Sequence, residues 1–300
     1  MKRYKIFKLV SYVAYSCNMS CKGCLAISDI PRNGVPDFEM TMQSIRDWSQ
    51  VLDPDWVVPL GGEPLLNPRI KEILLEMRRC WPKAKISFCT NGLLLRRIID
   101  KDFLEQVKPI EIRISLHKQN EEGKFFKDIV KDLLALYPKW HKNSFDWGDE
   151  LPGLPADHKT DYLYSFSHDT ITVSVSTEDT FVVPYRLDEQ GRMRPYNNDP
   201  VEAYKRCINL ELPVLYENHL WRCIPYPNLK DAVADFEQHW PSYKPYKVTD
   251  DLTEFFVESM KAHEICRMCP TWDDPVLKRT PDTIKILPNP NWIKKQIENK

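Results

Sequence analysis

Three cysteines near the start of the chain, Cys17, Cys21 and Cys24, are spaced Cys-x3-Cys-x2-Cys. They follow an apolar stretch that we predict to be a strand, so we place them on the loop after it. Three thiolates on one loop suit an iron-sulfur cubane whose fourth iron is free to bind a cofactor. A zinc knuckle or buried thiols are the alternatives, but a closed zinc site takes four protein ligands and no fourth lies nearby.

Four more cysteines form a second group in the last hundred residues: Cys207, Cys223, Cys266 and Cys269. The total of nine cysteines is odd and we see no export signal, which argues against a disulfide framework and for metal or cluster ligation under reducing conditions. The two remaining cysteines, Cys80 and Cys89, are predicted to be small buried side chains.

Composition excludes several functions. A formal net charge of -1 offers no general electrostatic grip on nucleic acid or on a membrane surface, although it leaves room for a local basic groove. No apolar run reaches the roughly 18 residues of a membrane-spanning helix. We therefore expect a cytoplasmic protein, with one domain over residues 1–200 and a smaller one over 201–300.

The first half alternates strand and helix patterns. Predicted strands cover 5–15, 56–60, 85–89 and 110–117, and predicted helices follow them over 41–52, 67–82, 94–107 and 121–137. Thr41 and the Asn67-Pro68 pair are the expected first residues of the first two helices. Repeated strand-helix units predict parallel strands with helices on the outside.

Polar motifs follow each of these strands. They are the cysteine loop, Gly61-Gly62-Glu63-Pro64, Thr90-Asn91-Gly92, and the pair Ser115 and His117. Because functional groups of such folds lie at the carboxyl ends of the strands, we expect all four motifs to form one site.

Strict alternation over 110–117 places Glu111, Arg113 and Ser115 on one face with His117. Glu111 and Arg113 fit either a polar substrate site or an internal ion pair. His117 is a candidate for a substrate or proton contact. Tyr185, at the end of a predicted last strand over 181–185, is a similar candidate.

Beyond residue 137 the pattern loosens. We expect an irregular insertion over 138–168 that covers the site, a strand over 170–176, and a hairpin that turns at Glu217-Asn218. A predicted helix over 252–263 leads into Cys266. The tail beyond about residue 281 is expected to be a surface arm.

Together these motifs resemble the radical S-adenosylmethionine (radical SAM) superfamily, whose cysteine loop matches Cys17, Cys21 and Cys24. The resemblance implies an α/β fold with a partial (βα)6-type parallel barrel and a 4Fe-4S cluster that binds SAM. Further residues would contact SAM: Gly61, Gly62, Glu63, Pro64, Asn91 and Ser115. The position before the third cysteine is often aromatic in the superfamily, whereas here it is Gly23.

The second cysteine group resembles the small twitch domain, a reduced SPASM domain with one auxiliary 4Fe-4S cluster. The resemblance implies that Cys207, Cys223, Cys266 and Cys269 are its ligands in a small α+β domain. A structural zinc site would use the same four residues.

The resemblance implies reductive cleavage of SAM to a 5'-deoxyadenosyl radical that abstracts hydrogen from a small-molecule, sugar or nucleotide-like substrate. A flavodoxin- or ferredoxin-type donor would supply the electron. Maturation of a ribosomal peptide, or modification of a nucleobase or DNA, is the alternative reaction. A zinc-stabilised binding protein without catalysis is the alternative from another class.

Overall fold

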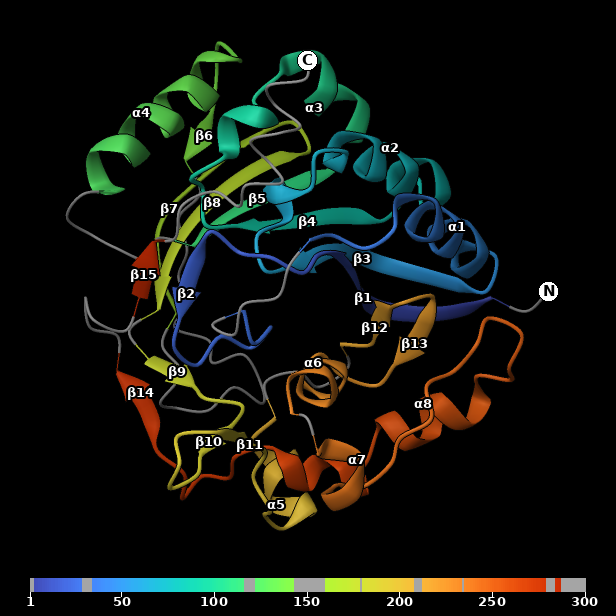
Figure 1. Cartoon of the computed structure of the whole chain (residues 1–300). Helices are drawn as coiled ribbons and strands as arrows, with labels where there is room; N and C mark the ends of the chain where they lie inside the picture. The colour runs from blue at the N-terminus through green and yellow to red at the C-terminus, as the bar shows by residue number, and fades with distance from the viewer. Residues whose placement is uncertain are drawn as a thin grey trace.

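A computed structural model describes residues 3–28, 34–115, 122–142, 160–178, 180–207, 212–233, 235–278 and 284–286. Its centre is one curved nine-stranded sheet (Figure 1). From edge to edge the strands are β13 (His219–Trp221), β12 (Val214–Tyr216), β1 (Tyr4–Ala14), β3 (Leu52–Gly61), β4 (Lys85–Thr90), β5 (Ile110–Ser115), β8 (Ile171–Glu178), β7 (Thr160–His168) and β6 (His141–Lys142).

The strands from β12 to β8 run parallel, and the strands at both edges run antiparallel. Four helices cover the convex face of the sheet (Figure 1). They are α1 (Phe38–Ser49), α2 (Ile70–Cys80), α3 (Lys101–Val107) and α4 (Glu122–Ala135). The predicted α/β class with a mostly parallel sheet is confirmed.

The two faces of the sheet differ in burial. On β4 and β5 the side chains that face the helices, such as Phe88 and Ile112, are fully buried. The alternate side chains Glu111, Arg113 and Ser115 are only partly buried. Period-two alternation therefore places the apolar residues under the helices and the polar residues on the concave face, as predicted.

The predicted last strand over 181–185 is shorter than expected and lies outside the main sheet. Residues Thr180–Val182 form β9, which pairs with β14 (Val276–Lys278) outside the main sheet. The sixth parallel strand is instead β12, where Val10 pairs with Val214. The turn between β12 and β13 lies where predicted, and Glu217 and Asn218 adopt positive φ angles of 49° and 59°.

The irregular insertion was predicted too long, because its last residues form β7, antiparallel to β8. Residues 143–159 lie outside the described part of the chain. The tail was expected to be a surface arm. Within it, Ile284–Ile286 form β15, which pairs with β2 (Met19–Cys21) in the cysteine loop, and residues 287–300 lie outside the described part of the chain.

The helices begin at other residues than predicted. Asp37 accepts the Met40 amide at 2.8 Å, so α1 begins before Thr41. Asn67 Nδ2 instead donates to the Val13 carbonyl at 2.7 Å, and α2 begins at Ile70. The helix predicted over 94–107 is two pieces, a 3-10 turn (Leu95–Arg97) and α3, which Asp100 caps.

The remaining elements lie on the concave side of the sheet (Figure 1). They are β10 (Arg186–Leu187), β11 (Met193–Arg194), α5 (Pro200–Lys205), α6 (Pro225–Ala232), α7 (Phe236–His239), α8 (Thr253–Ser259) and a 3-10 turn (Glu264–Met268). None of the helices in the ranges described above combines the length and the apolar character needed to cross a membrane.

An ion-pair network ties α1 to α2. The Glu76 carboxylate is almost fully buried and accepts hydrogen bonds from Arg79 Nη2 at 2.5 Å and Arg46 Nε at 2.6 Å. The hydrogen bond from Arg79 and then that from Arg46 lower the pKa of Glu76 to about 2, against the effect of burial.

We predict that Glu76→Gln lowers the free energy of unfolding by about 1 to 2 kcal/mol at pH 7. The expected loss is no larger because both arginines are partly exposed and water screens their charges. The unfolded carboxyl takes up its proton near pH 4.5 and the folded one near pH 2. The stabilisation is therefore full above pH 4.5 and disappears as the pH falls towards 2. Urea unfolding at pH 7, 4 and 3 measures this, with the exposed Glu72→Gln on the same helix as control. A constant difference across these pH values would contradict the prediction.

Candidate active site

The cysteine loop follows β1 directly. Within it, Cys17 Sγ accepts the Met19 amide at 3.3 Å, and Cys24 Sγ lies 2.9 Å from Ser28 Oγ. Gly23 has a φ of +79°, in the left-handed region that favours glycine. This backbone conformation explains why a glycine precedes the third cysteine in this chain.

The Gly-Gly-Glu-Pro turn packs directly against the end of β1. The Gly62 amide donates to the Ala14 carbonyl at 3.2 Å, and the Glu63 amide donates to the Ser16 carbonyl at 2.9 Å. A Cβ atom on Gly61 would lie 2.0 Å from the Ala14 oxygen, and one on Gly62 would lie 2.3 Å from the Ser16 oxygen. Only glycine fits at both positions, so the sequence of the turn follows from this close approach.

The Glu63 carboxylate joins two loops. It is 1% exposed, and its Oε1 accepts the Leu65 amide at 3.0 Å and the Thr90 hydroxyl at 2.7 Å. Its Oε2 accepts the Asn91 amide at 2.8 Å. Burial raises the pKa of Glu63 to about 7, and these three hydrogen bonds oppose that rise because they favour the charged form.

Asn91 extends this network to the cysteine loop. Its side-chain amide donates to Asn18 Oδ1 at 2.7 Å, and Asn18 is almost fully buried. Thr90 belongs to the Thr90-Asn91-Gly92 motif that was expected at the site, whereas sequence reasoning gave Asn18 no role. The position of Asn18 between two of the cysteines was the available signal.

All nine residues predicted to hold the first cluster and SAM line one cavity of about 310 Å³. They are Cys17, Cys21, Cys24, Gly61, Gly62, Glu63, Pro64, Asn91 and Ser115. The cavity lies at the carboxyl ends of β1, β3, β4 and β5, so the expectation of one shared site agrees with the geometry.

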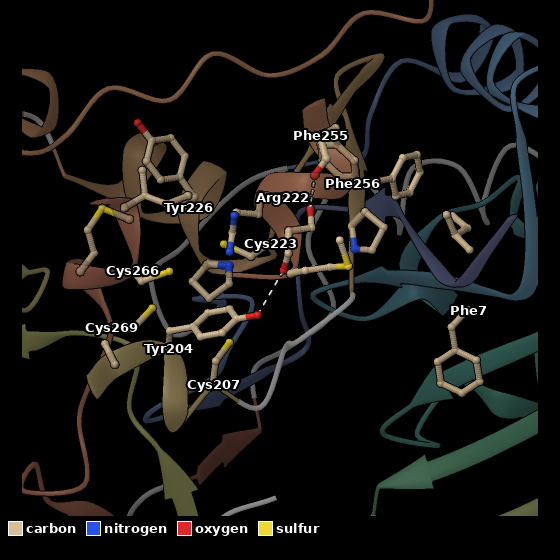
Figure 2. Close-up of a pocket in the computed structure, with 18 of the residues that line it drawn as sticks. Phe7, Tyr204, Cys207, Arg222, Cys223, Tyr226, Phe255, Phe256, Cys266 and Cys269 are labelled. Carbon is tan, nitrogen blue, oxygen red and sulfur yellow. Dashed lines mark hydrogen bonds between the residues drawn. The ribbon is translucent and has the colours of Figure 1, made fainter. Parts of the chain in front are cut away.

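The second cysteine group lines a separate cavity of about 250 Å³. Its members are Cys207, Cys223, Cys266 and Cys269. Figure 2 shows these four residues gathered on one side of the cavity, with Phe7, Phe255 and Phe256 on the other. Burial and, after it, the neighbouring Cys207 raise the pKa of Cys223 to about 12.

The loops around this second cavity are held by a buried arginine. Arg222, which precedes Cys223, donates to the carbonyls of Glu258 and Lys261, and the Cys269 amide donates to the Cys266 carbonyl at 2.9 Å. Across the described ranges, no three His, Cys, Asp or Glu side chains are arranged to hold a single metal ion.

The other predicted residues are more dispersed. Glu111 and Arg113 lie on the concave face below Ser115, and neither lines the cysteine-loop cavity. Tyr185 is buried in a core cluster with Tyr12 and Tyr216. His117 lies outside the described residues.

The two unassigned cysteines were predicted to be buried, and this was wrong. Both are partly exposed. Cys89 lines the cysteine-loop cavity, and Cys80 lies beside Glu76 and Arg79 on the outer surface.

Residues 11–146 match the model of the Radical SAM superfamily. A GTP 3',8-cyclase of Peptoclostridium acidaminophilum is 32% identical over 82 residues, which are 26% of this chain and 25% of that protein. Molybdenum cofactor biosynthesis protein 1 of Bos taurus is 27% identical over 103 residues, 33% of this chain and 16% of that protein. The matched stretches thus span a quarter or less of these relatives.

Among solved structures, that of BtrN in complex with AdoMet and 2-DOIA aligns with a TM-score of 0.48 at 12% identity, over 92% of this chain and 100% of that one. The family match and the placement of the cysteine loop after β1 define a radical SAM domain in residues 11–146. A domain of this kind indicates that the protein is an enzyme.

We predict that Glu63→Gln lowers the free energy of unfolding by about 1 to 3 kcal/mol, because a side-chain NH2 group would face donors that now share the carboxylate oxygens. Chemical denaturation of the protein without cluster measures this, with the exposed Glu39→Gln as control. A difference from the control below about 0.5 kcal/mol would show that the network contributes little.

Proposed function

We propose that this enzyme cleaves SAM reductively at a 4Fe-4S cluster held by Cys17, Cys21 and Cys24, and that the substrate is a small molecule, a sugar or a nucleotide-like compound. When bound, the cluster supplies the electron that splits SAM into methionine and a 5'-deoxyadenosyl radical, which removes hydrogen from the substrate. The observation that carries the proposal is the convergence of the three cysteines and the six SAM-contact candidates on one cavity.

The geometry supports distinct roles for the residues around this cavity. The amides of Gly62 and Glu63 already donate to β1 and the cysteine loop, so backbone carbonyl oxygens of the turn are the groups left to accept from the SAM amino group. Ser115 would reach the ribose, and Asn91 would line the adenosyl side. The Glu63 network would hold these groups in position and leave little freedom for rearrangement.

The second cavity supports an auxiliary 4Fe-4S cluster on Cys207, Cys223, Cys266 and Cys269, within a cluster-binding part over residues 201–300. A cubane binds one thiolate at each iron, and these four thiols line one cavity, whereas a structural zinc ion would use the same four residues. With four thiolates this cluster would have no open iron, which favours an electron-transfer or structural role.

Several kinds of substrate are candidates for this reaction. One relative is named as a GTP 3',8-cyclase, which keeps a nucleotide among the candidates. Maturation of a ribosomal peptide and modification of a nucleobase or DNA are the alternative reactions, with Glu111, Arg113, His117 and Tyr185 as candidate substrate contacts. A flavodoxin or ferredoxin would donate the electron.

We predict that the wild-type protein, reconstituted anaerobically, holds about eight irons per chain and forms 5'-deoxyadenosine from SAM under reduction. Replacing Cys17, Cys21 and Cys24 together with alanine removes about four of the irons and reduces 5'-deoxyadenosine to background. Iron analysis and chromatography of the products measure both effects. Stoichiometric zinc without SAM cleavage would establish the non-catalytic alternative instead.

A second variant separates the two clusters. Replacing Cys266 and Cys269 with alanine is expected to remove the other four or so irons while uncoupled SAM cleavage stays measurable, because these residues line a different cavity. Cys80→Ala, which touches neither cavity, is the control and should change neither quantity. Full iron content in the double variant would contradict an auxiliary cluster at these residues.

A further inference from the structure

The chain around the third cysteine folds back on itself in two consecutive turns. The Cys24 amide donates to the Cys21 carbonyl at 3.2 Å, and the Ile27 amide donates to the Cys24 carbonyl at 2.8 Å. The second turn brings the chain back, so that Ser28 Oγ lies 2.9 Å from Cys24 Sγ. Ser28 is buried and lines the cysteine-loop cavity together with Cys24. A hydroxyl group therefore lies beside one of the three proposed cluster ligands.

The second of these turns contains a residue in an unfavourable backbone conformation. Ile27 has a φ of 53°, in the left-handed region. Such a φ is an outlier for a β-branched residue, because the branched side chain crowds the backbone there. Conformations of this kind persist only where the surrounding structure holds them, and they are frequent at functional sites. The turn that delivers Ser28 is therefore strained.

Packing of the Ile27 side chain holds the strained turn in place. The side chain is fully buried, in the core cluster that also contains Tyr12 and Tyr216. Burial of a large apolar side chain is favourable and offsets the backbone strain. The position of Ser28 is thus fixed by contacts of its neighbour with the core of the protein, and not only by its own contact with Cys24.

The direction of the contact between Ser28 and Cys24 depends on the state of the sulfur. Between a thiol and a hydroxyl, either group can donate to the other. A thiolate bound to iron carries no proton, so in the pair Ser28 is then the group that donates. A hydrogen bond to a charged acceptor is stronger than one between neutral groups, and burial strengthens it further.

Hydrogen bonds to the ligand sulfurs are among the factors that set the reduction potential of an iron-sulfur cluster. Reduction adds one electron and makes the cluster and its thiolates more negative. A donor that faces a thiolate stabilises this more negative state more than the oxidised state, so it raises the reduction potential. A hydroxyl in the position of Ser28 is suited to this effect, because it points its proton at the sulfur and carries no charge of its own.

We propose that Ser28 donates a hydrogen bond to the Cys24 thiolate of the first cluster and thereby raises the reduction potential of that cluster. The inference rests on the proposed function, because it takes Cys17, Cys21 and Cys24 as the cluster ligands. Ser28 is a positioning residue that acts through Cys24. Its proton stays on the hydroxyl, and the single electron comes from the flavodoxin- or ferredoxin-type donor, for which a higher cluster potential makes the transfer more favourable.

A redox titration of the anaerobically reconstituted full chain, followed by electron paramagnetic resonance, measures this potential. The signal that is missing from the triple alanine variant of Cys17, Cys21 and Cys24 belongs to the first cluster. In Ser28→Ala, the ratio of reduced to oxidised first cluster at a fixed solution potential should fall about threefold to tenfold. A tenfold fall corresponds to a potential lower by about 59 mV for a one-electron couple.

A matched pair of variants separates the hydroxyl from the space that it fills. Ser28→Thr keeps the hydroxyl and should give a ratio within about twofold of the wild type, whereas Ser28→Val has nearly the same shape without a donor and should show the fall. Ser20→Ala makes the same change in the same loop, at a residue outside the cavity wall, and should match the wild type. Iron content and thermal unfolding of each variant show whether cluster and fold are intact.

An unchanged ratio in a folded Ser28→Ala, or equal ratios in Ser28→Thr and Ser28→Val, would overturn the inference. Loss of the first cluster from a folded Ser28→Ala would overturn it too, because Ser28 would then serve to hold the cluster. Formation of 5'-deoxyadenosine, measured on the same samples, keeps the inference apart from the proposed function. Cleavage of SAM with an unchanged ratio removes only the role of Ser28. A ratio that depends on the hydroxyl, without SAM cleavage, removes only the proposed reaction.

Discussion

One buried carboxylate holds the site together. Glu63 accepts from the Leu65 amide in its own turn and from Thr90 and the Asn91 amide in the turn after β4. Asn91 in turn donates to Asn18 between the first two cysteines. Three segments that are distant in sequence therefore form one rigid unit, and a displacement of any one would shift the thiols relative to the cofactor groups.

Features that depend on short-range physics could be predicted from the sequence. Apolar and polar residues alternate over β5, which shows the side chains that share each face of the strand. The Glu217-Asn218 turn follows from the tolerance of asparagine for positive φ. The cysteine spacing follows from cluster chemistry. The glycine pair follows from a close approach of two segments, in which an added Cβ would lie about 2 Å from a backbone oxygen.

Features that depend on long-range pairing could not be predicted. Nothing in the local pattern says that Val214 lies beside Val10, or that Ile284 lies beside Cys21. Asn18 was missed because its partner lies 73 residues away.

The pairing of β2 with β15 also sets an order of events during synthesis. Met19–Cys21 leaves the ribosome about 260 residues before Ile284–Ile286, so the cysteine loop has one unpaired edge through most of translation. Within the described part of the chain β15 is the last strand in sequence, so this edge of the cysteine loop gains its partner late in synthesis.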